Sequence, residues 1–235
     1  MKRIGIIGSG AIGTAIARLA VAADLDVAIA NSRGPESLTD LIGELGSRAQ
    51  AVEVGEAATF GDIAVLSIPL GAYSKLPNGL LDGVTTLSTG NYYPYREGRI
   101  PQLDALQLAT AEYELELLPG ARLVKAFNNI VAHHIPLLAH SHPRTALPVA
   151  GDDAEAKRRV ASLVELLGFD VVDAGTLAES WRFEPDSGAY TAIYAASGSG
   201  FESDFLADRG APLPASRLRE LLAASHRPDV AARRF

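Results

Sequence analysis

The chain has 235 residues, of which 48% are hydrophobic and 21% are charged. These proportions predict a globular protein with a substantial core and exclude disordered, collagen-like and coiled-coil classes. The formal charge of −7, from 21 Lys and Arg against 28 Asp and Glu, leads us to expect no nucleic-acid or membrane partner. The chain has no cysteine, so a redox function would require a bound cofactor.

The start of the chain is predicted to be a folded segment, although it superficially resembles a signal peptide. Lys2 and Arg3 precede an apolar stretch at residues 4–23. Glycines and Arg18 interrupt that stretch, so it is predicted to form a short strand, a glycine turn and a helix. No other segment is apolar over a length that spans a bilayer, and we expect a cytoplasmic protein.

Strand and helix patterns alternate along the chain. Short β-branched runs occur at residues 3–8, 27–31, 62–68, 84–89, 122–127, 145–150 and 169–173, and helical patterns at residues 11–23, 37–45, 104–117 and 152–167. Several runs are apolar at consecutive positions, as expected when helices cover both faces of a parallel sheet. The alternation predicts an α/β fold, a Rossmann-type doubly wound parallel sheet.

The composition changes after residue 173, where Gly, Pro and aromatic residues become frequent. Helical patterns return only near Thr191 and from Ala215. We interpret this part as a small cap. The predicted division is a nucleotide-binding Rossmann domain at residues 1–142 and a smaller C-terminal α/β cap region at residues 143–235.

A glycine-rich turn follows the first predicted strand and opens the first predicted helix. It fits the pattern G-x-G-x-x-G, with Gly8, Ser9, Gly10, Ala11, Ile12 and Gly13 in order. In this context Gly8 permits the tight turn, Gly10 lets the backbone approach a pyrophosphate, and Gly13 lets the helix pack on the strand. The helix N-terminus offers free N–H groups to the phosphates. The turn therefore predicts a dinucleotide site.

The end of the second predicted strand indicates which dinucleotide is bound. An NAD site usually places Asp or Glu there, to bind the ribose 2′-hydroxyl. This chain has Asn31, Ser32 and Arg33 instead. A guanidinium and a hydroxyl suit a dianionic 2′-phosphate, so we expect NADP(H) as the cofactor.

Other nucleotide and metal chemistries lack their signatures. The chain has no G-x-x-x-x-G-K-[ST] loop, and none of its seven tyrosines is followed four residues later by Lys. Histidines cluster at His133, His134, His140 and His142, but their spacing lacks the i, i+4 pair of a helical metal site. We therefore expect no metal.

These motifs, taken in order, resemble the family of coenzyme F420-dependent NADP oxidoreductases. The resemblance rests on the glycine turn, the Asn31-Ser32-Arg33 tip, the strand end Ser67-Ile68-Pro69, and Gly151-Asp152-Asp153 followed by a helix and Asp173-Ala174-Gly175. It covers most of the chain. It implies an enzyme that moves hydride between NADP(H) and a deazaflavin (coenzyme F420) or flavin-like acceptor. It also implies that Ser67, Ile68 and Pro69 line the nicotinamide pocket and that Asn128 lies near the ring.

The acceptor is expected between residues 89–95 and 180–183, two segments that depart from the family pattern. Transfer between two planar rings needs close placement more than a general acid. An NADPH-dependent carbonyl or imine reductase, the first alternative, would need a proton donor. Lys125 is the first candidate catalytic residue and Tyr93 another, with Tyr92 and His134 also open. A non-catalytic NADP(H) sensor is the second alternative, and a homodimer is expected.

Overall fold

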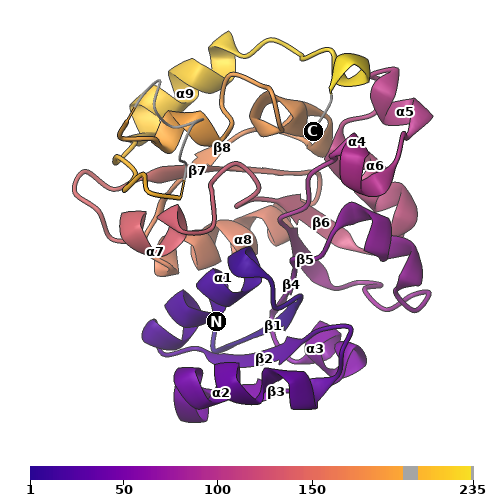
Figure 1. Cartoon of the computed structure of the whole chain (residues 1–235), viewed down its shortest axis with the longest axis vertical. Coiled ribbons are helices and arrows are strands. Elements are labelled where there is room, and N and C mark those ends of the chain that lie inside the picture. Colours follow the sequence, from indigo (N-terminus) through magenta and orange to yellow (C-terminus); the bar gives the residue numbers. More distant parts are fainter. Residues whose placement is uncertain (198–205, 234–235) are drawn as a thin grey trace.

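The computed structural model describes residues 1–197 and 206–233, and over these residues the strands form one eight-stranded sheet (Figure 1). Its order is β3-β2-β1-β4-β5-β6-β7-β8. The strands are β1 (Arg3–Ile7), β2 (Asp26–Ala30), β3 (Ala49–Ala51), β4 (Ile63–Leu66), β5 (Thr85–Ser88), β6 (Arg122–Lys125), β7 (Ala146–Gly151) and β8 (Asp170–Asp173). All neighbours pair in parallel except β6 and β7. The predicted Rossmann-type α/β fold is confirmed.

Helices connect the strands. The α-helices of the described chain are α1 (Ala11–Ala22), α2 (Thr39–Leu45), α3 (Val54–Thr59), α4 (Pro94–Glu97), α5 (Pro101–Asp104), α6 (Thr110–Leu117), α7 (His134–Leu138), α8 (Ala154–Leu166) and α9 (Ala215–Ala224). Short 3-10 helices include η3 (Leu70–Lys75), η4 (Leu177–Phe183) and η5 (Thr191–Tyr194). None of the helices in the described ranges has the length and apolar content to cross a bilayer.

Both faces of the sheet are covered by helices. Ile4 and Ile6 of β1 join a core cluster that contains residues of α1, α8 and α9. Ile7 of the same strand joins a second cluster with residues of α3, η3 and the end of α6. Side chains alternate between the two faces of a strand, so a strand buried on both faces is apolar at every position. This explains the continuous apolar runs in the sequence.

The structure differs from the predicted elements in the first half of the chain. The strand β3 and the helix α3 were not predicted, because three and six residues give little periodicity. The helix expected at residues 104–117 is two helices, α5 and α6. Leu106 lies between them with a positive φ of 56°, a backbone conformation that a helix cannot continue through.

The C-terminal part extends the same sheet. The strand β7 pairs with the end of β6 in antiparallel orientation, at Val124–Gly151 and Lys125–Ala150, and β8 then pairs with β7. Figure 1 shows these orange elements continuing the sheet away from β1 and β2. The proposed boundary at residues 142 and 143 falls in the connection between α7 and β7, and the division into two domains stays a prediction.

Arg233 links two segments that are far apart in the sequence. Arg233 is 5% exposed, and its guanidinium donates to the Tyr92 carbonyl at 2.7 Å, the Pro185 carbonyl at 2.6 Å and the Asp186 carboxylate at 2.5 Å. Arg99 in turn donates to the carbonyl of Arg233 at 2.8 Å. The chain near residue 233 thus connects the segment after β5 to the segment after η4.

The close approach of β1 to α3 gives a prediction. A Cβ added to Gly5 would lie 1.7 Å from the Ala57 carbonyl oxygen. We expect Gly5→Ala to lower the free energy of unfolding by about 1–3 kcal/mol or more, because strand and helix must separate. Gly43, within α2, has no atom within 4 Å of its added Cβ, and Gly43→Ala should stabilise the protein by about 0.5–1 kcal/mol. Urea unfolding of both variants measures the two changes. An equal change in the free energy of unfolding for both variants would contradict the close packing of β1 on α3.

Candidate functional site

A cavity of 540 Å³ lies at the carboxyl ends of β1, β2 and β4. The sheet order reverses between β1 and β4, and ligands of doubly wound folds bind at such a point. The predicted residues that line this cavity are Gly8, Ser9, Gly10, Asn31, Ser32, Arg33, Ser67, Ile68 and Pro69. Ala11, Ile12 and Gly13 form the first turn of α1 beside it. The fold thus brings three separate sequence motifs to one cavity.

The glycine turn has the backbone geometry that its sequence indicates. Gly8 has a φ of 116°, and an added Cβ would lie 2.1 Å from the Ser67 carbonyl oxygen. A Cβ on Gly13 would lie 2.0 Å from the Gly8 carbonyl oxygen, so the helix packs directly on the turn. A Cβ on Gly10 would meet nothing within 4 Å. The space in front of Gly10, at the N-terminus of α1, fits a pyrophosphate that approaches the backbone.

Asn31 organises the tip of β2. Its side-chain amide donates to Ser9 Oγ at 3.0 Å and to Ser37 Oγ at 2.9 Å. Its Oδ1 accepts from the backbone N–H of Arg33 at 2.8 Å. Asn31 therefore connects the glycine turn to the loop that presents the exposed Ser32 and Arg33. Sequence reasoning missed Ser37, because its contact with Asn31 depends on the fold of this loop.

The segment after β4 forms another side of the cavity. Beyond the predicted Ser67, Ile68 and Pro69, the helix η3 brings Lys75 to the cavity lining. Lys75 is exposed and, with Arg33, is the second cationic side chain at the cavity. No local pattern indicates this lysine as a site residue, since its position depends on the turn that η3 makes after the strand.

Asn128 follows β6 and lies in a buried polar network, and it is not among the residues that line the 540 Å³ cavity. Its side-chain amide donates to Asn91 Oδ1 at 3.2 Å and to the Phe183 carbonyl at 3.0 Å, and Asn91 donates back to the Asn128 carbonyl at 2.8 Å. Phe127 before it has a positive φ of 60°. That conformation is costly for an aromatic residue and often marks a functional segment. The Asn128 Oδ1 atom is buried and has no hydrogen-bond partner in the structure.

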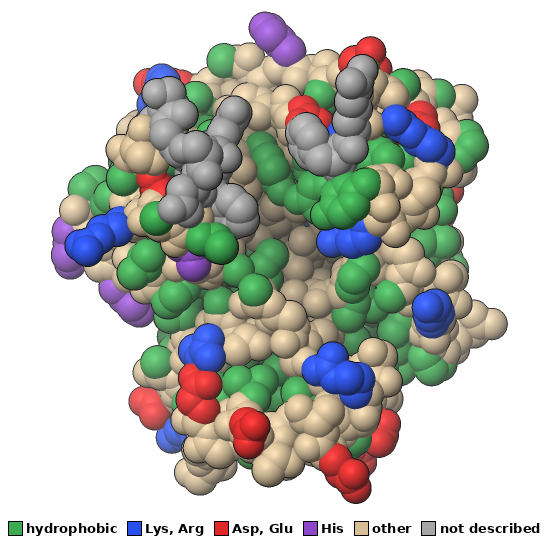
Figure 2. Space-filling model, in the orientation of Figure 1, with side chains coloured by type: hydrophobic (Ala, Val, Ile, Leu, Met, Phe, Trp, Pro, Cys, Tyr) green, Lys and Arg blue, Asp and Glu red, His purple; other side chains and the backbone are tan. Residues whose placement is uncertain are grey.

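Tyr93 belongs to the same network. Its hydroxyl contacts the hydroxyl of Tyr190, and Asn91 donates to both, at 3.4 Å and 3.3 Å. Burial raises the pKa of Tyr93, and the Arg96 guanidinium lies 4.9 Å above its ring centroid. Tyr95 lies beside it with a centroid distance of 6.0 Å and is 69% exposed. Figure 2 shows one face of the molecule with a hollow near its centre and hydrophobic side chains around it.

Lys125 lies in the interior. Its side chain is completely buried, and its ammonium donates to Glu114 Oε1 on α6 at 2.7 Å. The Glu114 side chain is also completely buried. Lys125 therefore forms a buried ion pair from an interior strand of the sheet, and its role in catalysis stays a prediction.

The segment at residues 180–184 packs on the start of α6 and beside Tyr92. The Glu184 carboxylate accepts from the backbone N–H and the hydroxyl of Thr110, at 3.0 Å and 2.7 Å, which fixes η4 on the start of α6. Trp181 contacts Arg182 and lines a cavity of only 10 Å³ with Tyr92. That space holds about one water molecule and no ring. Trp181 therefore faces Tyr92 rather than the ring of Tyr93, and the expectation that the acceptor lies between residues 89–95 and 180–183 stays a prediction.

The remaining candidates have structural partners. His134 is completely buried, and its ring contacts Asp208 at 3.1 Å, while burial lowers its pKa. Asp153 caps α8 by accepting from the backbone N–H of Ala156 at 2.8 Å. Within residues 1–197 and 206–233, no three His, Asp or Glu side chains gather in a way that could hold a metal ion.

Known proteins and one family model are similar to this chain. Residues 3–92 match the model of the family described as NADP oxidoreductase coenzyme F420-dependent. The rat (Rattus norvegicus) metalloreductase STEAP3 is 28% identical over 184 residues, which make up 77% of this chain and 36% of STEAP3. The chain thus spans about a third of the length of that curated relative.

Two solved structures resemble the whole arrangement. The hypothetical protein SMa0349 from Sinorhizobium meliloti is 32% identical with a TM-score of 0.69, covering 79% of this chain and 91% of that one. A candidate F420-dependent NADP reductase from Arthrobacter sp. FB24 is 22% identical with a TM-score of 0.64, covering 77% and 87%, and shares the fold. The dinucleotide cavity, the family model and the Sinorhizobium relative together show that this chain belongs to the family of coenzyme F420-dependent NADP oxidoreductases.

Proposed function

We propose that the protein transfers hydride between NADP(H), bound in the 540 Å³ cavity, and a deazaflavin (coenzyme F420) or flavin-like acceptor. When bound, NADPH supplies a hydride that reduces the acceptor by two electrons, and the reduced ring takes the accompanying proton from bulk solvent after the transfer. The chain's own part is to bind both rings, orient them face to face and exclude water. Membership of the family supports this proposal, and the structure adds the arguments below.

NADP(H) rather than NAD(H) is proposed from the charges at the cavity. The tip of β2 carries Ser32 and Arg33, and Lys75 lines the same cavity from η3. Two exposed cations and a hydroxyl favour a 2′-phosphate, because hydrogen bonds between charged groups are strong. Asn31 holds the backbone of Arg33 in place, so the loop is organised before the cofactor binds.

The choice of acceptor rests on one observation. The two candidate proton donors, Lys125 and Tyr93, are held in contacts with other groups of the protein. Reduction of a carbonyl or an imine needs a proton donor whose pKa is close to the ambient pH. Lys125 is buried against Glu114, and the pKa of the Tyr93 hydroxyl is raised by burial. Direct transfer between two planar rings requires no such donor. We therefore assign the half-buried ring of Tyr93 to acceptor binding, with the exposed Tyr95 beside it.

Reduction by NADPH of a panel of acceptors tests this function. Mixing the protein and NADPH with coenzyme F420, FMN, simple ketones and cyclic imines should give rapid loss of absorbance at 340 nm with the planar acceptors. Turnover of ketones or imines alone would instead identify a carbonyl or imine reductase. Tight NADPH binding without oxidation by any acceptor would favour a sensor.

Arg33→Ala is expected to change the cofactor preference. The variant should weaken NADPH binding by about 1.5–3 kcal/mol, the range for a hydrogen bond to a charged group, and leave NADH binding almost unchanged. Titration of the nicotinamide fluorescence with each cofactor measures both constants. An equal loss for NADPH and NADH would contradict the assignment of Arg33 to the 2′-phosphate.

Substitutions at Tyr93 separate a ring contact from a proton donor. Tyr93→Ala should lower turnover with the active planar acceptor roughly tenfold, because the ring surface is lost, while NADPH affinity stays within about threefold. Tyr93→Phe keeps the ring and should retain most of the turnover. Trp181→Ala should lower the melting temperature and leave acceptor kinetics unchanged. A Tyr93→Phe variant as inactive as Tyr93→Ala would show that the hydroxyl supplies the proton.

A further inference from the structure

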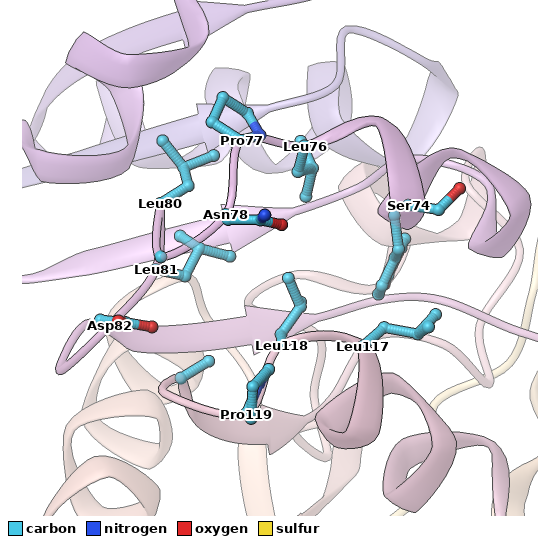
Figure 3. Close-up of a pocket in the computed structure, with 13 residues that line it drawn as sticks. Ser74, Leu76, Pro77, Asn78, Leu80, Leu81, Asp82, Leu117, Leu118 and Pro119 are labelled. Carbon is cyan, nitrogen blue, oxygen red and sulfur yellow. The ribbon is translucent and has the colours of Figure 1, made fainter.

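One wall of the proposed cofactor cavity has open space on both sides. The segment from Ile68 to Pro77, which contains η3, lines the 540 Å³ cavity. Leu76 and Pro77 also line a second cavity of 220 Å³ on the other side of the segment. Figure 3 shows them across this second cavity from Leu117, Leu118 and Pro119. Ile68 and Leu76 pack against the core cluster that contains Leu70 and Tyr73, so the wall between the two cavities is supported on its buried side.

The buried residues of η3 in this wall are Leu70 and Tyr73, and Tyr73 is the one that carries a polar group. Tyr73 is 1% exposed, and its hydroxyl lies 3.1 Å from Ser88 Oγ at the end of β5. Burial and the neighbouring charge of Glu114 raise its pKa well above the usual value, so the phenol stays protonated. The hydroxyl is tightly enclosed, since a Cβ on Gly90 would lie 2.8 Å from it and 2.2 Å from Glu114 Oε1.

The carboxylate beside Tyr73, that of Glu114, forms an ion pair with Lys125. The Glu114 and Lys125 side chains are completely buried and 2.7 Å apart, and Glu114 Oε2 has no hydrogen-bond partner in the structure. A buried ion pair is often no more stabilising than apolar residues of the same volume, because both charges lose their hydration. The stability of the fold alone therefore does not account for this pair. The contacts of this ion pair with Tyr73 and with the turn at Gly90 indicate that the pair positions these two parts of the chain.

We propose that the Lys125–Glu114 pair and Tyr73 act as positioning residues that hold the wall at residues 68–77 against the cofactor. Lys125 holds Glu114 by a hydrogen bond, Glu114 lies beside the Tyr73 hydroxyl, and the contact of that hydroxyl with Ser88 fixes η3. This inference rests on the proposed placement of NADP(H) in the 540 Å³ cavity. It gives Lys125 a function that needs no contact with the substrate.

Tyr73→Phe is the direct test, because it removes only the hydroxyl. We expect the dissociation constants of NADPH and NADH to rise together, by roughly threefold to tenfold, since the wall contacts a part that both cofactors share. The turnover number at saturating NADPH should change less than the Michaelis constant for NADPH. Tyr194→Phe is the matched control. Its hydroxyl is also completely buried, accepts from Asn129 at 3.2 Å and donates to the Ala146 carbonyl at 2.9 Å, but it lies away from the wall.

A double variant separates position from stability. Glu114→Leu with Lys125→Met replaces the ion pair by apolar side chains of similar volume and should leave the melting temperature equal or higher. We expect it to weaken NADPH and NADH binding as Tyr73→Phe does. Since this variant can fail to fold, the single Tyr73→Phe variant decides the matter by itself.

The outcomes distinguish this inference from the proposed function. The positioning role is overturned if the Tyr73→Phe variant binds both cofactors as the wild type does. It is also overturned if Tyr73→Phe weakens cofactor binding no more than Tyr194→Phe does. If Arg33→Ala still weakens NADPH selectively in that case, the cofactor placement stands. If Arg33→Ala leaves NADPH binding unchanged, the cofactor placement itself is wrong.

Discussion

The carboxyl end of β1 is the constraint on which the rest of the site depends. There the backbone of Gly8 lies against Ser67 from β4 on one side, and α1 packs on it through Gly13 on the other. Three chain segments meet at distances that leave no room for a Cβ, so the start of α1 and the end of β4 have fixed positions relative to each other. The free space in front of Gly10 exists because these neighbours are held back from it. The dinucleotide cavity is therefore a consequence of backbone packing more than of any particular side-chain contact.

The parts of the structure that follow from local sequence were predictable. The glycine turn, the Asn31 to Arg33 tip and most strands could be recognised because each depends on neighbours along the chain. The short strand β3 could not be recognised, because it is too brief to show any periodicity. The partner of Lys125 is another case: a lysine in an apolar strand requires an anion, but nothing in the sequence shows that Glu114 on α6 supplies it.

The two halves of the proposed reaction site are built by different means. The nucleotide half uses backbone turns and a loop held by Asn31, all within the first third of the fold. The half beyond β5 and β6 uses asparagine and tyrosine side chains that contact across long stretches of chain, such as Tyr93 with Tyr190. Buried polar networks of this kind specify one arrangement when their groups are paired, and here the Oδ1 of Asn128 is the atom that has no hydrogen-bond partner.

The guanidinium of Arg233 has a further consequence for how the molecule assembles. It joins Tyr92 to Pro185 and Asp186, residues that are far apart in sequence and near the region assigned to the acceptor. Synthesis runs from the N-terminus, so this closure waits until residue 233 has been made, after every strand of the sheet.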